Sequence, residues 1–169
     1  DGKGKIRRQK TIEISVPAGI DDDQILNVGG KGNAGSNGGP NGDLHVYITV
    51  RPHAIFTRRG NDVWCDMPIT FTQAALGAEV TVPTLDGKVS YTVHEGTQPG
   101  DVFKLKGKGI QSINGRGRGD QYVRVTVEVP KNLSKRQKEL LQEFEQNADE
   151  KNYQKRKSFF GKIKDLFED

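Results

Sequence analysis

Cysteine is nearly absent from this chain, which has a single one, Cys65, in 169 residues. A single cysteine excludes an intramolecular disulfide and fits a reducing compartment. Long apolar runs are absent too. No stretch approaches the roughly 18 continuous apolar residues of a membrane-spanning helix, and the polar first residues are not those of a signal peptide. We therefore expect a cytoplasmic protein with no membrane partner.

A strong excess of one charge is also lacking, as are catalytic groupings. The net charge is only +4 and the pI is about 9.1, so most charges should lie on a solvated surface. The histidines, His45, His53 and His94, are scattered and lack zinc-ligand spacing. Cys65 falls on the inward side of an expected strand and is interpreted as a small core residue. The sequence thus predicts no enzyme, with no catalytic or metal site.

Glycine, in contrast, is plentiful and carries a duplication. Gly30-Lys31-Gly32 and Gly42-Asp43 recur, at an offset of 77 residues, as Gly107-Lys108-Gly109 and Gly119-Asp120. Sliding residues 12–53 onto 89–130 needs no gap and gives about 12 identities in 42 positions. The chain therefore contains two copies of one structural unit.

Alternating apolar and polar residues predict a mainly β fold. Pro68 should lie on an edge strand or a bulge because it has no N–H to donate. Residues 72–77 predict one helical turn with Thr72 as N-cap, and Asp86-Gly87 predicts a tight hairpin. The expected strands cover residues 11–16, 25–28, 44–50, 62–71, 78–83, 89–93, 102–105 and 122–129.

Helical patterns follow the sheet region. Ser134 and Gln137 form a capping-box pattern ahead of a helix over residues 135–146. After a charged linker, residues 158–169 can form a second amphipathic helix, which is marginal unless it docks on something. The predicted fold is two tandem β-sandwich-like subdomains, with a short helix in the second and an amphipathic helix at the C-terminal end. The apolar stripe of the first C-terminal helix comprises Leu133, Leu140, Leu141 and Phe144.

Two motifs imitate known binding sites. Residues 30–35 fit the dinucleotide pattern G-x-G-x-x-G, but residues 36–42 are too rich in Gly, Asn and Pro to form the helix that the pattern requires. Residues 114–119 resemble an arginine–glycine nucleic-acid segment, yet only Arg116 and Arg118 are basic and no aromatic residues interleave. We interpret both as turns or loops.

The two copies differ in what precedes them. No counterpart of residues 54–88 precedes the first copy in this sequence, so the strand over residues 11–16 would lack the hairpin that covers residues 89–93. Either that hairpin lies upstream of residue 1, or an edge and an apolar row are left open. An open edge beside Ile12, Ile14 and Val46 would accept an extended peptide as an additional strand. The alternative, that these are ordinary core residues, remains open.

A set of motifs extends across nearly the whole chain: Val16-Pro17-Ala18-Gly19-Ile20, Gly42-Asp43-Leu44, Arg51-Pro52-His53-Ala54-Ile55-Phe56, Arg58, Gly60-Asn61-Asp62, Ala75-Leu76-Gly77, Val82-Pro83-Thr84-Leu85-Asp86-Gly87, Gly107-Lys108-Gly109, Gly119-Asp120, Arg136-Gln137 and Ser158-Phe159-Phe160. Together these motifs resemble the C-terminal region of the bacterial DnaJ family of J-domain co-chaperones. Asp1-Gly2-Lys3-Gly4 is similar to the x-G-x-G that follows the last cysteine pair of the family's zinc-binding repeats. Asp23 departs from the family, which usually has glycine there, as Gly100 does in the second copy. No His-Pro-Asp tripeptide of a J domain occurs.

The resemblance implies a dimeric chaperone module that holds unfolded clients for a DnaK-type partner. Zinc is expected only in a module upstream of residue 1, and no cofactor or nucleic acid in this chain. The implied division is 1–10, exit of the zinc module; 11–53, an incomplete domain I; 54–131, domain II; 132–146, a dimerisation helix; and 147–169, linker and tail. The implied client groove comprises Ile12, Ile14, Val46, Ile48 and Phe56, and the implied dimer contact Leu133, Leu140, Leu141 and Phe144.

Two alternatives from other functional classes remain. The pI, with Arg116 and Arg118, is compatible with a basic β-rich protein that binds nucleic acid. The apolar stripe of the first C-terminal helix is compatible with a purely structural dimerisation domain.

Overall fold

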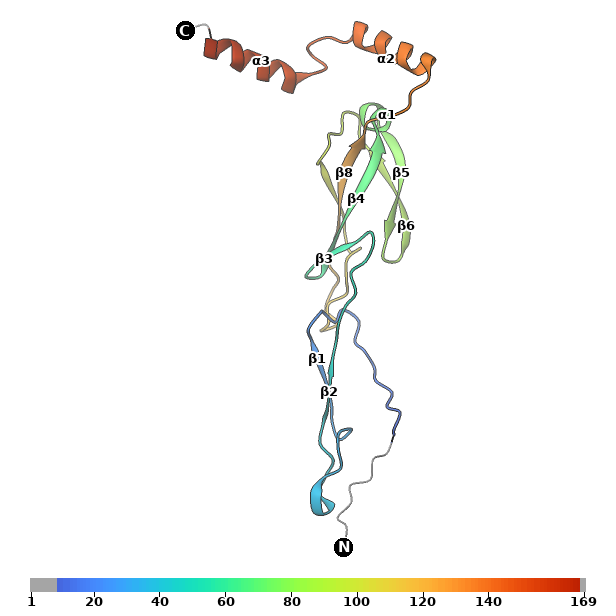
Figure 1. Cartoon of the computed structure of the whole chain (residues 1–169), viewed down its shortest axis with the longest axis vertical. Coiled ribbons are helices and arrows are strands. Elements are labelled where there is room, and N and C mark those ends of the chain that lie inside the picture. The colour runs from blue at the N-terminus through green and yellow to red at the C-terminus, as the bar shows by residue number, and fades with distance from the viewer. Residues whose placement is uncertain (1–8, 168–169) are drawn as a thin grey trace. The chain divides into compact units, whose positions relative to one another are not determined.

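The computed structural model describes residues 9–167 and is mainly β with short helices (Figure 1). It separates into two units, one ending at Glu128 and one beginning at Val129. The predicted fold class, β-rich with a short helix and C-terminal helices, is confirmed. The strands are β1 Ile25–Val28, β2 Leu44–Tyr47, β3 Thr57–Arg59, β4 Asp62–Thr70, β5 Ala78–Thr84, β6 Gly87–Val93, β7 Val102–Leu105 and β8 Gln121–Glu128. The helices are the 3-10 turn η1 Ser36–Gly38, α1 Phe71–Leu76, α2 Lys135–Asn147 and α3 Gln154–Phe167.

The second copy contains the core. Its four-stranded sheet has the order β3-β4-β8-β7, with β4 and β8 parallel, and β5 pairs with β6 as a separate hairpin. Alternate residues of β4, from Val63 to Ile69, are buried as predicted. Val82 of β5 and Val93 of β6 join Val123 of β8 in the core, so the hairpin packs on one face of the sheet. Burying each valine contributes about 1.5–3 kcal/mol.

The first copy is a two-stranded antiparallel ribbon of β1 and β2. Leu26 faces Val46 across it, and both are half-buried, whereas Ile25 and Tyr47 on the other face are 51% and 75% exposed. The alternation that predicted a half-buried strand here is therefore confirmed.

The duplication is confirmed by strand register. Ile25 pairs with Tyr47, and 77 residues later Val102 pairs with Arg124. The turns repeat as well: the amide of Gly32 donates to the carbonyl of Gly42 at 2.7 Å, and in the second copy Gly109 donates to Gly119 at 2.8 Å. The two copies therefore share one hydrogen-bond pattern.

The repeated Gly-Lys-Gly motif has a steric cause. Gly30 and Gly107 both have φ of +66°, a left-handed conformation that favours glycine. A Cβ on Gly32 would lie 2.5 Å from the carbonyl oxygen of Asp43, so the second glycine is required by the close approach of two backbones. The aspartates complete the motif, because Gly30 donates to Asp43 Oδ1 at 2.9 Å and Gly107 to Asp120 Oδ1 at 2.7 Å.

The strand predicted over residues 11–16 is wrong. These residues lie within the described range but form no strand. Their counterpart in the second copy belongs to β6, which pairs with β5, and within residues 9–167 no segment supplies such a partner to the first copy. A strand without a neighbour leaves its backbone donors and acceptors to water, so the regular ladder does not form.

Several element boundaries also differ from the prediction. The strand β2 ends at Tyr47 rather than at residue 50, because Ile48 bonds to the turn around Asp23, whose φ is +58°. The hairpin loop is Leu85 and Asp86, with Gly87 already in β6. The helix α3 begins at Gln154, earlier than residue 158, since the intervening basic residues are good helix formers. Its predicted residues 168 and 169 lie outside the described residues.

The cap of α1 was misplaced as well. Thr70, not Thr72, is the N-cap, and it forms a capping box with Gln73. Phe71 is consequently the first helical residue and is 39% exposed, not an inward strand residue. Pro68 lies where β4 has only β8 beside it, so its predicted edge position is confirmed. The predicted capping box ahead of α2, Ser134 with Gln137, is also present.

Candidate functional site

The predicted groove residues fall into two groups in the structure. Val46 and Ile48 lie on the half-buried side of the β1–β2 ribbon, alternating with exposed neighbours. Ile12 and Ile14 are half-buried in the extended segment that precedes the ribbon, where Glu13 between them is exposed. Phe56 instead packs against the core of the second copy. The first four therefore belong to the first copy, and Phe56 lies at the beginning of the second.

A cavity of about 260 Å³ opens in the second copy between β6, β7 and β8. Its apolar wall includes the rings of Tyr91 and Phe103, which stack with centroids 3.6 Å apart. The lining residues are Tyr91, Val93, His94, Thr97, Asp101, Val102, Phe103 and Val125. The lining also includes His94, Thr97 and Asp101, so this is a small cleft with one aromatic wall and a partly polar mouth.

The duplication gives each lining residue of this cavity a counterpart in the first copy. The residues 77 positions earlier are Ile14, Val16, Pro17, Ile20, Gln24, Ile25, Leu26 and Ile48. Two of them, Ile14 and Ile48, were predicted as groove residues from the sequence. The others, above all Val16, Ile25 and Leu26, were missed, although the 77-residue offset would have identified them. Where the second copy has two aromatic rings, the first has the aliphatic Ile14 and Leu26.

The exposed fractions of one pair of corresponding residues show how the environments of the two copies differ. Val93 is 2% exposed beneath β5, whereas its counterpart Val16 is 57% exposed. The first copy also exposes Ile25, Tyr47, Val50 and, just beyond it, Ile55. Clustered exposed apolar side chains of this kind mark sites of protein contact. These exposed residues are not the predicted groove residues, because Ile25 and Tyr47 lie on the ribbon face opposite Val46, and Ile12, Ile14 and Val46 are half-buried. The open surface beside Ile12, Ile14 and Val46 stays a prediction.

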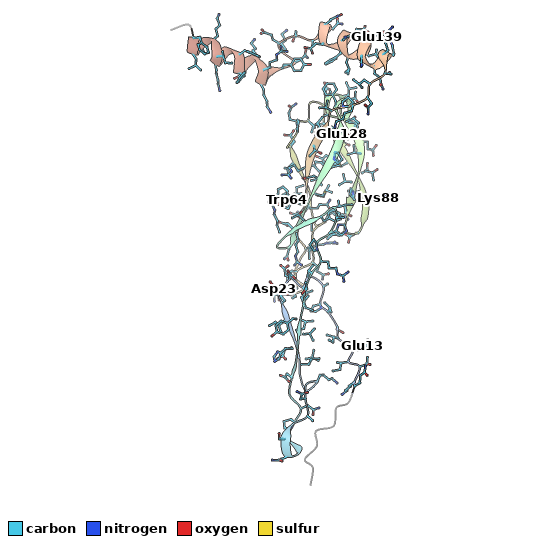
Figure 2. All side chains as sticks on the ribbon, in the orientation of Figure 1. Glu13, Asp23, Trp64, Lys88, Glu128 and Glu139 are labelled. Atoms are coloured by element: carbon cyan, nitrogen blue, oxygen red, sulfur yellow. The ribbon has the colours of Figure 1, made fainter. Side chains whose placement is uncertain are left out.

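The turn before β1 is tied to the second copy by one arginine. The Arg58 guanidinium donates to the carbonyl oxygens of Gly19 at 2.9 Å and Ile20 at 2.7 Å, and lies 3.4 Å from the carboxylate of Asp21. Asp23, labelled in Figure 2, completes this turn with its left-handed backbone. Arg58 thus orients the first-copy surface from outside it.

Phe56 is positioned by a neighbouring histidine. The imidazole Nδ1 of His53 accepts from the amides of Ile55 at 3.1 Å and Phe56 at 3.3 Å. The ring of His53 also lies 5.0 Å from that of Phe56. The Arg51-to-Gly60 stretch that carried the family resemblance is therefore a joint that connects the first copy to the second.

The charged groups serve structure rather than chemistry. The pKa of Asp120 is lowered by the hydrogen bond from the Gly107 amide and then by Lys104. The pKa of Asp86 is lowered by its hydrogen bonds with Arg118, at 2.7 and 2.9 Å, which tie the β5–β6 hairpin to the loop over residues 107–119. Burial raises the pKa of the Cys65 thiol, so it stays protonated and is a poor nucleophile.

The predicted dimer residues lie in the second unit. Leu140, Leu141 and Phe144 of α2 are 47%, 40% and 47% exposed, and Leu133 ahead of the helix is half-buried. Their shared helix face follows from spacings of three and four residues.

Residues 9–167 contain neither a metal-binding cluster nor a membrane-spanning helix. No group of three or more His, Cys, Asp or Glu side chains there is placed to hold a metal ion. None of the helices in this range is long and apolar enough to cross a membrane. Residues 1–4, whose pattern resembles the exit of a zinc module, lie outside the described residues.

Comparison with known proteins covers both units. The family described as DnaJ C terminal domain matches residues 3–130, and that described as Chaperone protein DnaJ C-terminal region matches residues 136–169. A relative from Ruminiclostridium cellulolyticum, named Chaperone protein DnaJ, is 60% identical over 96% of this chain and 43% of its own length. Relatives of the same name from Acetivibrio thermocellus and Clostridioides difficile are 53% and 55% identical over 97% and 95% of this chain, and 42% of their own lengths. The chain thus spans less than half the length of these relatives.

Proposed function

This chain belongs to the DnaJ C-terminal domain family, and from that premise we propose that it is a client-binding module that holds extended apolar segments of non-native polypeptides. The observation that carries the proposal is the contrast between Val16, 57% exposed, and its buried counterpart Val93. Within residues 9–167 the first copy exposes apolar side chains whose counterpart in the second copy is covered by the β5–β6 hairpin. A client segment would add as a strand along an exposed edge of the first copy.

The client groove in this proposal comprises Ile12, Ile14, Val46 and Ile48. Phe56, which the sequence grouped with them, packs against the second-copy core. Each buried client side chain supplies about 1.5–3 kcal/mol, while ordering an unfolded segment costs about 2–5 kcal/mol. Two or three anchors therefore give affinity in roughly the micromolar to millimolar range. Weak, reversible binding suits a protein that must release its clients.

The cavity beside Tyr91 and Phe103 is proposed as a second client site, since two of its lining residues, Tyr91 and Val125, are the counterparts of the groove residues Ile14 and Ile48. Its volume of about 260 Å³ suits one apolar side chain rather than a whole strand, because β5 already pairs with β6.

Several properties of the whole protein belong to this proposal. It is a cytoplasmic homodimer that contacts through Leu133, Leu140, Leu141 and Phe144, delivers clients to a DnaK-type chaperone, and holds zinc in a module upstream. Domain I covers residues 11–53 and domain II residues 54–131. Two grooves in one dimer raise the effective affinity without new contacts. The exposed α2 stripe supports the dimer, and the pairing of Arg118 with Asp86 engages one of the two arginines on which the nucleic-acid alternative depends.

The test is a pair of double variants measured by fluorescence anisotropy with a permanently unfolded, apolar-rich client. Ile12→Asp with Val46→Asp should weaken binding at least tenfold, because two charges enter the apolar surface. The control, Ser15→Asp with His45→Asp, adds the same charges at exposed positions of the same segments and should leave binding within twofold. Unchanged binding of the first variant would show that the groove is misplaced.

A further inference from the structure

The strand β7 lies at the edge of the four-stranded sheet, with β8 as its one neighbour among the described residues. The amide of Val125 in β8 donates to the carbonyl oxygen of Asp101, just before β7, at 2.8 Å. Backbone groups alternate in direction along a strand, so those of Phe103 face β8 and those of Val102 and Lys104 face away from it. An extended segment can bind these outward groups as an additional strand.

The two faces of β7 give such a segment different environments. Phe103 points toward the β5–β6 hairpin, where its ring stacks on Tyr91 and lines the cleft of about 260 Å³. Val102 and Lys104 lie on the opposite face, where Val102 is 46% exposed and the Lys104 side chain 52%. A residue placed beside Phe103 would direct its side chain over the cleft, and the next residue would lie beside Lys104.

One end of β7 is basic and the other is acidic. Lys104 forms an ion pair with Asp120 at 3.3 Å but stays half exposed, and Lys106, two residues further on, is exposed. Asp101 lies at the opposite end of β7, where its carboxylate accepts from the Gln98 amide at 2.8 Å. Acidic side chains of a bound segment are therefore attracted beside Lys104 and Lys106 and repelled beside Asp101.

The duplication shows that these two lysines are specific to the second copy. Their counterparts 77 positions earlier are Asn27 and Gly29. Phe103 corresponds to Leu26, so the apolar position is kept although both cations are absent. The strands β1 and β2 also pair in the same register as β7 and β8 without them. The fold of the repeated unit therefore does not account for the lysines.

We propose that the edge of β7 binds an extended polypeptide segment whose apolar side chain enters the cleft beside Phe103 and whose acidic side chains, on one side of it, face Lys104 and Lys106. The inference rests on the proposed function, since this cleft is its second client site, and it names the class of client. The two copies then divide clients by charge. Neutral apolar segments suit the first copy, and segments with acidic residues beside the apolar one suit the second.

Phosphates of a nucleic acid would also suit the two lysines. A polypeptide is favoured because the outward backbone groups of Val102 and Lys104 match those of an extended chain. The rings of Tyr91 and Phe103, moreover, stack on each other with 6° between their planes, so the ring faces that meet are closed to bases.

The test compares peptides that differ only in charge. Two fluorescent peptides each carry one leucine in a neutral polar background, with glutamates at the first and third positions before the leucine in one peptide and after it in the other, which covers both strand directions. Each has a counterpart with glutamines. By fluorescence anisotropy, one glutamate order should bind the unaltered chain at least threefold more tightly than its glutamine counterpart, as expected of two exposed ion pairs. The difference should disappear at about 500 mM salt.

Variants of the chain locate the preference. Lys104→Gln with Lys106→Gln should remove it, while the glutamine peptide binds as before. The matched control, Lys31→Gln with Lys88→Gln, removes two other exposed lysines, of which Lys88 is labelled in Figure 2, and should keep the preference. Amide exchange followed by NMR should slow at Val102 and Lys104 when the glutamate peptide is bound, because their amides then have a partner.

Three results would overturn the proposal. The first is equal affinity of the glutamate and glutamine peptides for the unaltered chain in both orders. The second is a preference that survives Lys104→Gln with Lys106→Gln, or unchanged exchange at Val102 and Lys104 in the complex. The third is displacement of the bound peptide by a short oligothymidylate that the same double variant no longer binds, which would favour nucleic acid.

Failure of the proposed function gives a different result. If no peptide binds at concentrations up to about 1 mM, and Ile12→Asp with Val46→Asp leaves binding of the unfolded client unchanged, both client sites are misplaced. If that variant loses client binding while charge makes no difference to the peptides, only the assignment of acidic clients to the second copy fails.

Discussion

At the scale of single residues, the repeated glycines have two different duties. Gly107 needs its left-handed backbone, with open space around the position of a Cβ, whereas Gly109 has an ordinary φ but meets the carbonyl oxygen of Asn61 at 2.5 Å from such a Cβ. Conformational strain and steric overlap are therefore separable within one motif. The same division holds for Gly30 and Gly32 in the first copy.

We expect Gly107→Ala to lower the free energy of unfolding by about 1–2 kcal/mol, the cost of a left-handed non-glycine residue. Gly109→Ala should cost more, about 2–4 kcal/mol, because backbone must move to relieve the overlap. Urea unfolding followed by the fluorescence of Trp64, the one tryptophan, measures both. The reverse order of the two losses would contradict the steric assignment.

Asp120 predicts a pH dependence. Its folded pKa is lowered, so it contributes stability that is present above its unfolded pKa, near 3.8, and is lost as pH falls through the folded value. Asp120→Asn should therefore lower stability at neutral pH and flatten the decline of stability below about pH 4. Urea unfolding midpoints between pH 2 and 7 provide the measurement. An unchanged acid limb in the variant would exclude Asp120 as a contributor.

At the scale of elements, the short helix α1 shows how a cap is chosen between two neighbouring threonines. The hydroxyl of Thr70 accepts from the Gln73 amide at 3.1 Å, and the Gln73 side chain accepts from the Thr70 amide at 3.0 Å. This reciprocal pair is the T-x-x-Q signature of a capping box, which the sequence contains. Thr72, by contrast, lies inside the helix.

Thr70→Ala should lower the free energy of unfolding by about 1 kcal/mol, the usual value of an N-cap. Thr72→Ala at an exposed helical position should change it by less than about 0.5 kcal/mol. Thermal unfolding of the two variants beside the unaltered chain provides the comparison. Equal losses of stability in the two variants would contradict the assignment of Thr70 as the N-cap.

At the scale of the whole molecule, Arg58 couples the two copies across more than thirty positions of sequence, through hydrogen bonds to Gly19 and Ile20. Hydrogen bonds from a charged donor contribute about 1.5–3 kcal/mol each when well formed. The first copy has little core of its own, so this contact should determine how firmly its apolar surface is held for a client.

Arg58→Ala should speed hydrogen exchange at the amides of Asp23 and Ile48 in the first copy at least tenfold, while the core strands β4 and β8 stay protected. Exchange followed by mass spectrometry measures this. Arg59→Ala is the matched control, since Arg59 lies 4.6 Å above the ring of Trp64 in the second copy and does not reach the turn. Equal protection in the Arg58 variant would show that the joint does not couple the copies.

The sequence by itself determined whatever depends on neighbours along the chain. Strand β4 was predicted from the alternation of Val63 to Ile69, and the duplicated turns from Gly-Lys-Gly and Gly-Asp, because pleat direction and turn conformation are local properties. The family followed from the same motifs. Of the candidate site, Val46 lies on the half-buried face of β2, and Ile48, just beyond the end of that strand, is half-buried as well.

Only the tertiary structure decided what depends on partners from elsewhere in the chain. Residues 11–16 have the pattern of a strand but no strand beside them, and Phe56, grouped with the groove by sequence, packs on the second-copy core. No local pattern contains the bond from Arg58 to the turn at Gly19. A strand needs a neighbouring strand, and a pocket or a contact between the two copies needs residues from a second segment. The periodicity of one segment does not identify that second segment.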